Sequence, residues 1–525
     1  MAQLFRHTNC FALACALLPA FASPYPAAAS AGLAAEGPAA GSAESAGAAH
    51  SGAHAREYSI INLVPLQAAG LLNERGEVAM AMTETLGVDN SVTTYRFFDG
   101  RRIRDYGSFA GRSLGLVDLN DNGMVVGRIS PAAEPFNPRA FTWTAARGLR
   151  ILPGPATAAA NAVNNLNWTV GWAGEPATAS RAALWTNSGP RINLGPPAQR
   201  SEAAAINLFG VTVGSAFGAD GLSRAMLWSP LGGALDLGMI EGGTGAAATH
   251  INTRGDVAGY AGRQTQSLGF YWSRARGMVP ITADNIFRTL SVVDLNELGD
   301  VAGNTLISDG QGFFAPYVWS LGAGYRQLPL AGAPSGNLYG LNNLRESVGD
   351  LQLSIQDRAD RRAALWNGVV GPVDLNTRLV RARSGLVLNT ARAINDRGEI
   401  LADSNAGLVL LRPGRTGTPA PVLGPITGIP RYAQITRGDT VDLTAAFVDS
   451  SVHESHTATA GVNDGCPQNA PSLREVRSTG EVNLRHKFCR AGAVTVRIKV
   501  RDRAGNESEV ALWHGVREPN PGTQP

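Results

Sequence analysis

One motif recurs eight times along this chain of 525 residues and dominates what the chain can fold into. In each copy an aliphatic residue precedes an asparagine, and a short turn follows. A strand comes next and contains Val-Gly or a related pair, whose second residue lies seven positions after the asparagine. The asparagines are Asn73, Asn120, Asn164, Asn207, Asn252, Asn296, Asn342 and Asn395. A repeat of this length is one supersecondary unit, which buries its apolar face only against its neighbours.

A second element follows each motif. Six copies have a tryptophan here, which follows an aliphatic or aromatic residue in five of them and Thr142 in the other: Trp143, Trp185, Trp228, Trp272, Trp319 and Trp366. The first copy has Phe97-Phe98 at this place and the last has Leu410-Leu411. A Gly-rich turn and a short Leu-Gly strand come next, so each unit offers four short strands, as a β-propeller blade does. Because the tryptophans share one register, we expect them to be buried between blades.

The strand count predicts a closed ring of eight blades. Residues 58–63 resemble a Leu-Gly strand without preceding partners, and the last repeat lacks its own strand of this kind. We therefore expect residues 58–63 to pair beside residues 407–411, which would leave no open sheet edge. The predicted propeller covers residues 57–414.

The repeats resemble those of the HAF family of extracellular repeat proteins, which occur in secreted bacterial proteins. The resemblance covers residues 58–412 and rests on the Asn, Val-Gly and Trp positions given above. It implies export and a propeller-like fold, and it implies no particular chemistry.

A second, smaller β domain is predicted after a Thr/Pro/Gly linker at 415–421. Residues 440–444 and 494–500 alternate apolar and polar side chains with the period of half-buried strands. Residues 422–516 resemble a PKD-type immunoglobulin-like sandwich through Asn463-Asp464-Gly465 and similar short stretches, although Gly461 to Asn463 stand where the family has a tryptophan. The fold class is therefore all-β, and residues 517–525 are expected to form a disordered tail.

The N-terminus predicts export. Arg6, an apolar stretch from Cys10 to Leu18 and the Ala20-Phe21-Ala22 sequence fit a signal peptide over residues 1–22, with a second acceptable cleavage site near Ala29. Residues 23–56, rich in Ala, Gly and Ser, have too little apolar surface to fold and are predicted to be disordered. Only Cys466 and Cys489 remain after cleavage, and an oxidising compartment favours a disulfide between them.

Composition narrows the range of partners. Charged residues make up 17% of the chain and the formal net charge is +3, so no basic surface for nucleic acid is indicated. No second long apolar run exists, and no integral membrane segment is expected after removal of the signal. The mature protein is expected to be secreted or periplasmic.

Several motifs could carry chemistry, and each has a plainer structural interpretation. Residues 111–115 read Gly-Arg-Ser-Leu-Gly, the pattern of a nucleophile elbow, but they fall inside a β array. His250 is a lone histidine two places before Asn252, a candidate ligand residue at a channel mouth or a structural histidine. Asp118, Asn120 and Asn122 resemble the start of a calcium loop, but Asn120 already has the repeat's turn role.

The C-terminal domain has two further sets of candidate ligands. His453, Glu454 and His456 could meet a metal ion or form a solvated loop. Asp449, Asp464 and Asp502 could bind calcium or end strands and turns. We assign no catalytic residue, metal or cofactor from the sequence.

The sequence favours a secreted, non-catalytic binding or scaffold protein whose ligand is an extracellular glycan or an envelope protein. The alternative is a secreted polysaccharide lyase or hydrolase with its site at one mouth of the ring. A mouth lined by Asp, Glu, His, Arg or Tyr with perturbed pKa values would favour the enzyme, and a mouth of Ala, Gly and aliphatic residues would favour the scaffold.

Overall fold

The computed structural model describes two groups of β-sheets in the part of the chain after Arg56. The described residues are 56–519 except for gaps at 66–67, 88–89, 109–111, 132–136, 175–178, 188, 197–198, 264–265, 283–289, 309–311, 358, 368–370, 381, 415–420, 430–434, 450–454, 477–478 and 504–506. The predicted signal, nearly all of the segment at 23–56 and nearly all of the predicted linker lie outside them. Among the described residues the one helix is a short 3-10 turn, η1 (Leu375–Arg378), and no helix is long and apolar enough to cross a membrane.

Strands of the first four repeats form four antiparallel sheets of four strands each. Within every sheet the strands pair in chain order, as consecutive hairpins do. The sheets are β2 (Ala68–Leu72), β3 (Val78–Gly87), β4 (Asn90–Phe98), β5 (Ile103–Ser108); β6 (Arg112–Leu119), β7 (Val125–Pro131), β8 (Arg139–Thr144), β9 (Gly148–Ile151); β10 (Thr157–Val163), β11 (Thr169–Gly174), β12 (Arg181–Trp185), β13 (Ile192–Asn193); and β14 (Ser201–Ile206), β15 (Thr212–Phe217), β16 (Ser223–Trp228), β17 (Ala234–Asp236).

The next three repeats form sheets of the same kind. They are β18 (Gly243–Ile251), β19 (Val257–Arg263), β20 (Gln266–Ser273), β21 (Gly277–Ile281); β22 (Leu290–Leu295), β23 (Val301–Ser308), β24 (Phe313–Ser320), β25 (Gly324–Gln327); and β26 (Ser335–Leu341), β27 (Ser347–Gln352), β28 (Arg361–Trp366), β29 (Val373–Asp374). The last repeat supplies three strands of a further sheet, β30 (Leu388–Ile394), β31 (Ile400–Ser404) and β32 (Gly407–Pro413).

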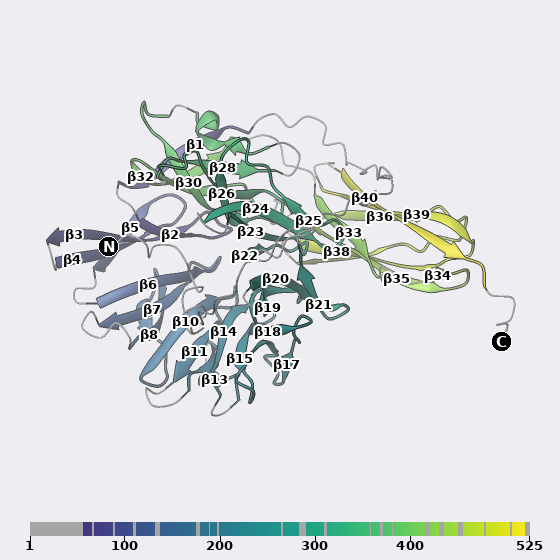
Figure 1. Cartoon of the computed structure of the whole chain (residues 1–525), viewed down its shortest axis with the longest axis horizontal. Helices are drawn as coiled ribbons and strands as arrows, with labels where there is room; N and C mark the ends of the chain where they lie inside the picture. The colour runs from purple at the N-terminus through teal and green to yellow at the C-terminus, as the bar shows by residue number, and fades with distance from the viewer. Residues whose placement is uncertain are drawn as a thin grey trace, which may run out of the picture. The chain divides into compact units, whose positions relative to one another are not determined.

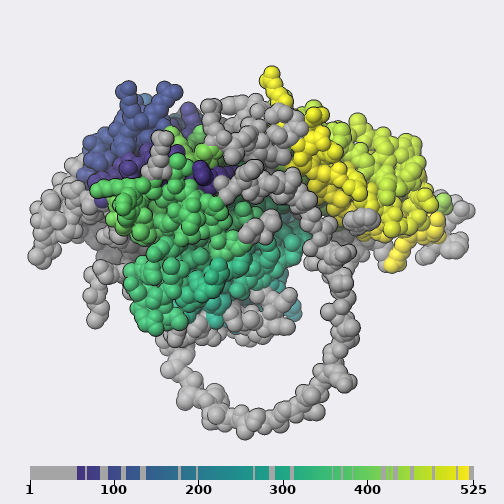
Figure 2. Space-filling view, turned by 90° about the horizontal axis from the view of Figure 1, so that it is seen from above, coloured from purple at the N-terminus to yellow at the C-terminus, as the bar shows by residue number. Residues whose placement is uncertain are grey.

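The fourth strand of that last sheet comes from the start of the described chain. Strand β1 (Tyr58–Val64) pairs antiparallel with β32, and Ile60 lies opposite Leu411. Figure 1 shows β1 beside β32, and in Figure 2 purple N-terminal atoms lie against green atoms of the last repeats. The predicted pairing of residues 58–63 with the last repeat is confirmed.

Apolar side chains fill the space between consecutive sheets. Phe97 of the first sheet packs with Phe141 and Trp143 of the second, and each later sheet shares a core in the same way with its successor. The last sheet packs against the first through Leu408 and Met80. The six repeat tryptophans are at most 9% exposed, so their predicted burial is confirmed.

Six sheets have a glycine seven residues after the repeat asparagine, where it lies close to the inner strand, and the last sheet has Ala402 there. In seven of the sheets a β-bulge interrupts the pairing of the inner strand with its neighbour, as between Ala160 and Ala162. The bulge brings a carbonyl so close that a Cβ on Gly171 would lie 2.0 Å from the Ala159 oxygen. In the first sheet this pairing has no bulge, and there Met80 takes the place of the glycine.

Residues 422–517 form two further sheets around one hydrophobic core. One sheet has the order β33 (Val422–Thr427), β35 (Thr440–Val448), β38 (Thr479–Lys487), β37 (Ser472–Val476). The other has the order β34 (Ile435–Thr436), β40 (Glu507–Arg517), β39 (Gly492–Arg501), β36 (Thr457–Val462). Leu443, Phe447 and Val482 of the first sheet pack against Val496 and Ile498 of the second.

Cys466 and Cys489 form a disulfide within this C-terminal domain, with their Cα atoms 5.9 Å apart. Replacing both by serine is expected to destabilise the domain by about 3 kcal/mol, because the bridge restricts the unfolded chain. Chemical denaturation of the wild type and the double variant, each with and without a reductant, checks this expectation. The reductant should destabilise only the wild type, and two alkylatable thiols in the unreduced exported protein would contradict the bridge.

Candidate binding site

The repeat asparagines make a cycle of hydrogen bonds at the turn that follows each inner strand. The Oδ1 atom of Asn207 accepts the N–H groups of Phe209 and Val211 and so holds its own turn. Its Nδ2 atom donates to the backbone oxygen of Asn252, the equivalent residue of the next sheet. The same bond recurs from each asparagine to the next, and Asn395 closes the cycle by donating to the oxygen of Asn73 at 3.1 Å.

A second series of bonds runs through the residue after each asparagine. The Asp396 carboxylate accepts the N–H of Asn343, and the N–H of Asp396 donates in turn to Glu74. Glu74 donates through its own N–H to Asp121, and Glu297 accepts the N–H and the hydroxyl of Thr253. Four carboxylates therefore gather at the turn end of the inner strands, each with at least one oxygen bonded to the neighbouring turn.

Burial raises the pKa of three of these four carboxyl groups. Burial raises the pKa of Glu74, and the charges of Asp396 and Asp121 raise it further. Burial also raises the pKa of Asp396 and of Glu297. The Glu74 side chain is itself exposed to solvent.

Replacing Glu74 by glutamine is expected to raise the unfolding temperature at pH 8, because the amide still accepts the Asp396 N–H and the repulsion disappears. A raised carboxyl pKa means that the folded protein holds this proton more tightly than the unfolded chain, so stability falls as pH rises through the folded pKa. The gain from Glu74→Gln should therefore shrink between pH 8 and pH 5. Thermal unfolding across this range measures it, with exposed Glu241→Gln as the control; an equal gain at both pH values would contradict the repulsion.

His250 lies on the inner strand β18, as the sequence indicates, and its side chain is half-buried. Its Nδ1 atom lies 2.8 Å from the Thr249 hydroxyl. Burial lowers the pKa of His250, and the nearby Asp294 of the next sheet opposes this shift. The arrangement favours a neutral imidazole in the wall of the inner strands, and the contacts of His250 identify no ligand.

The oxygens of the calcium-like sequence are engaged in holding two sheets together. Asp118 accepts the N–H of Leu119 and, from the next sheet, that of Val163. Burial raises the pKa of Asp118 to about 6. Asn120 belongs to the asparagine cycle, and Asn122 donates its amide to the next turn rather than turning an oxygen toward a common centre with Asp118.

The described residues include only some of the remaining sequence candidates. Ser113 lies within strand β6 rather than at a strand-to-helix turn, and Gly111 falls outside the described residues. His453 and Glu454 also fall outside them. Buried His456 bonds to Asp449 at 2.9 Å and to Glu475 at 3.1 Å, and so joins strands of the sandwich.

Asp464 lies beside the disulfide of the C-terminal sheets. Asp464 accepts from His486 at 2.8 Å and from the N–H of Cys466, and these bonds together with the His486 charge lower its pKa, although burial acts in the opposite direction. Asp502 is buried at the end of β39. Asp464 lies close to both cysteine sulfurs, but the disulfide leaves these without free thiolates for a metal.

The C-terminal domain contacts the turn end through one repeat in particular. Arg345 occupies the left-handed position (φ 63°) that glycine holds in most of these turns. Its Nε donates to Asp300 and its Nη1 to the backbone oxygen of Leu423 in β33. Leu298 and Leu344, from neighbouring turns, pack with Ala446 of β35.

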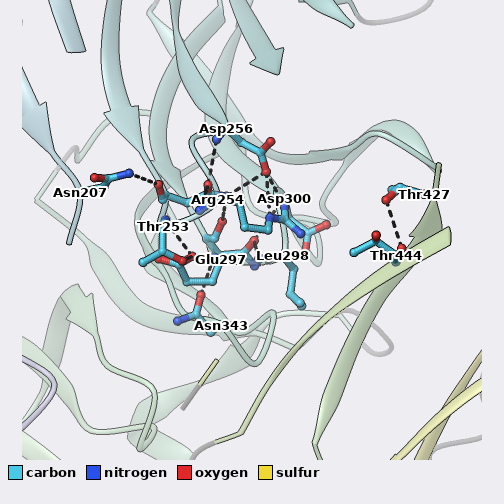
Figure 3. Close-up of polar contacts among 12 residues, drawn as sticks. Asn207, Thr253, Arg254, Asp256, Glu297, Leu298, Asp300, Asn343, Thr427 and Thr444 are labelled. Atoms are coloured by element: carbon cyan, nitrogen blue, oxygen red, sulfur yellow. Dashed lines mark hydrogen bonds and ion pairs between the residues drawn. The ribbon is translucent and has the colours of Figure 1, made fainter. Parts of the chain in front are cut away.

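Beside this contact lies a cavity of about 190 Å³. The turns contribute Phe209, Thr253, Arg254 and Glu297, and Figure 3 shows the last three close together with their polar contacts. The C-terminal domain contributes Ala446, Phe447, Arg474, Thr479, Gly480 and Glu481.

The charged groups of the cavity differ in how far they are already engaged. Arg254 is paired with Asp256 at 2.5 Å, and Glu297 accepts two bonds from Thr253. Arg474 and Glu481 lie directly opposite each other on β37 and β38. Within the described part of the chain they form no ion pair with each other or with other residues. This guanidinium and this carboxylate are therefore available to a ligand.

Sequence reasoning found the asparagines but missed this cavity and an acidic position that supports the turns. Five repeats have Asp or Glu four residues after the asparagine, and each accepts a bond from the asparagine Nδ2: Glu77, Asp256, Asp300, Glu346 and Glu399. That recurrence is visible in the sequence. The cavity is not, because Phe209 and Arg474 lie far apart in the sequence.

Several solved structures are similar to part of this chain, and one of them is a β-propeller domain. The β-propeller domain of the Trilobed protease from Pyrococcus furiosus is 10% identical, with 61% of this chain and 95% of that one covered and a TM-score of 0.41. A streptogramin B lyase is 9% identical, with 57% and 93% covered and a TM-score of 0.35. Similarity this weak gives no argument about activity, and neither a family model nor a curated protein matches the chain.

Proposed function

We propose that this chain is an exported, non-catalytic binding protein of the periplasm or the extracellular space. Its repeats form an eight-bladed β-propeller, and residues 422–516 form a PKD-type immunoglobulin-like sandwich. The shared core between the last and the first sheet and the closed asparagine cycle support the ring. The ligand is a part of an extracellular glycan or of an envelope protein.

The observation that carries the proposal is the unengaged pair Arg474 and Glu481 beside exposed Phe209 in one cavity. Ligand sites combine an apolar surface with a few polar groups that fix orientation. The four carboxylates of the turns, by contrast, already accept bonds from neighbouring turns, which gives them a structural role. Acidic side chains with raised pKa values do occur at the turn end of the inner strands, as expected for an enzyme. We therefore keep an enzyme as the second candidate.

A specific pair of residues favours that second candidate. Glu297, whose pKa is raised by burial, lines the same cavity as Glu481. A protonated carboxyl and a carboxylate acting on one glycosidic bond are the groups that glycoside hydrolases use. A hydrolase would release new reducing ends from polysaccharides, and Glu297→Gln would abolish that release.

Screening the exported protein against a mixed panel of oligosaccharides, dipeptides and short peptides tests the proposal, with binding followed by native mass spectrometry. We expect at least one compound to bind without being consumed, and the double variant Arg474→Ala, Glu481→Ala to lose it. Binding that survives this double variant would move the site elsewhere. If the protein converts the bound compound into a product, the enzyme hypothesis is correct and the hypothesis of a non-catalytic binding protein is wrong.

A further inference from the structure

We propose that the cavity binds one uncharged saccharide ring, with Phe209 as the surface on which the ring stacks. This inference rests on the proposed function, because it names the ligand of the same cavity. Three properties of the cavity lead to it, namely its charge balance, its exposed aromatic side chain and its size.

The cavity wall is balanced in charge. Its two unengaged charged groups, Arg474 and Glu481, have opposite charges, and Arg254 is already paired with Asp256. A ligand with a fixed charge of one sign would leave groups of that same sign desolvated without a partner, which is costly. A hydroxyl both donates and accepts, so a polyhydroxylated neutral ligand can accept from Arg474 and donate to Glu481 at the same time.

The apolar side of the cavity has one prominent element. Phe209 stands two residues after Asn207 at the tip of its turn and is 47% exposed. The equivalent residues Leu298 and Leu344 pack with the C-terminal domain, whereas Phe209 lines the cavity with its ring accessible. An aromatic face carries negative charge density and attracts the weakly positive C–H groups of an apolar ligand face. A sugar ring presents such C–H groups on one face and hydroxyls around its edge.

The size of the cavity limits what it can hold. Its volume of about 190 Å³ is below the roughly 300–1,000 Å³ of pockets for drug-sized ligands. One ring fits inside, and further units of a glycan would extend into solvent. A peptide would place charged or amide groups against both Arg474 and Glu481, so binding of peptides is the competing outcome of the test.

Calorimetric titration of the protein with neutral disaccharides tests the inference, using cellobiose, lactose and N,N′-diacetylchitobiose as probes. A digalacturonate and the dipeptide Ala-Ala serve as charged comparisons. We expect at least one neutral disaccharide to bind and the digalacturonate to bind at least tenfold more weakly. Phe209→Ala should weaken that binding by about tenfold, and Phe209→Trp should retain it.

Leu166→Ala is the matched control, because Leu166 holds the same place in another repeat, is 46% exposed and does not line the cavity. It should leave binding unchanged, and thermal unfolding shows whether each variant is folded. Binding of Ala-Ala or digalacturonate in preference to the neutral sugars would overturn the saccharide inference while leaving a binding protein. Failure of every compound in both this titration and the mixed panel would overturn the proposed function as well. Sugar binding that Phe209→Ala does not weaken would refute the stacking role.

Discussion

Replacing Trp366 by alanine is expected to lower the free energy of unfolding by about 3–5 kcal/mol. The side chain is 1% exposed and packs with Leu338 and Leu341 at the contact between two sheets. Its Nε1 atom donates to the backbone oxygen of Pro329 at 2.9 Å, and alanine leaves that oxygen without this donor. The loss therefore combines a cavity between sheets with a broken hydrogen bond.

Equilibrium denaturation in guanidinium chloride measures this effect. Trp366→Phe keeps most of the apolar volume and should cost less than Trp366→Ala. Leu231→Ala is the surface control, because Leu231 is 98% exposed, and it should change stability by about 0.5 kcal/mol or less. A Trp366→Ala protein within 1 kcal/mol of the wild type would show that the sheets do not depend on this contact.

Replacing Asn395 by alanine is expected to cost about 3 kcal/mol, because it removes partners from several buried groups at once. Asn395 is 2% exposed, accepts the N–H groups of Arg397 and Glu399, and donates to the oxygen of Asn73 in the first repeat. The substitution thus disrupts one turn and the bond that closes the asparagine cycle.

Asn122 provides the matched comparison in the same denaturation measurements. It is an exposed turn asparagine that donates to the neighbouring turn from outside the asparagine cycle. Asn122→Ala should cost less than about 1 kcal/mol, since water can replace exposed bonds. If Asn395→Ala and Asn122→Ala lower the free energy of unfolding equally, the asparagine cycle has no special role in stability.

Regular repetition made the repeat fold predictable. The recurring Asn, Gly and Trp positions located the hairpins, and the unpaired strand at 58–63 had one open partner in the last repeat. The burial of Trp228 and Trp366 followed from their shared register. Such features repeat along the chain, so each copy supports the interpretation of the others.

The contacts between repeats were less accessible from the sequence. The turn role of Asn207 was predicted from local chemistry, whereas its bond to Asn252 depends on how one sheet lies beside the next. The bulge that makes Gly171 necessary is likewise a property of paired strands. The cavity depends on Phe209 and Arg474, which are far apart in the sequence and line one cavity only in the folded chain. The residue pattern within one segment does not predict contacts between distant segments.

The pairing of β1 with β32 also sets the order in which the protein can assemble. Ser59 bonds to Arg412, 353 residues later, so the first strand cannot find its partner until almost the whole array has been synthesised. Until then the last sheet lacks its fourth strand, and pairing over such a separation is slow. The intermediate exposes strand edges that promote aggregation. If the protein folds after translocation, the entire chain is present and this intermediate exists for a shorter time. A linear repeat protein, whose first and last repeats do not pair, has no comparable final step.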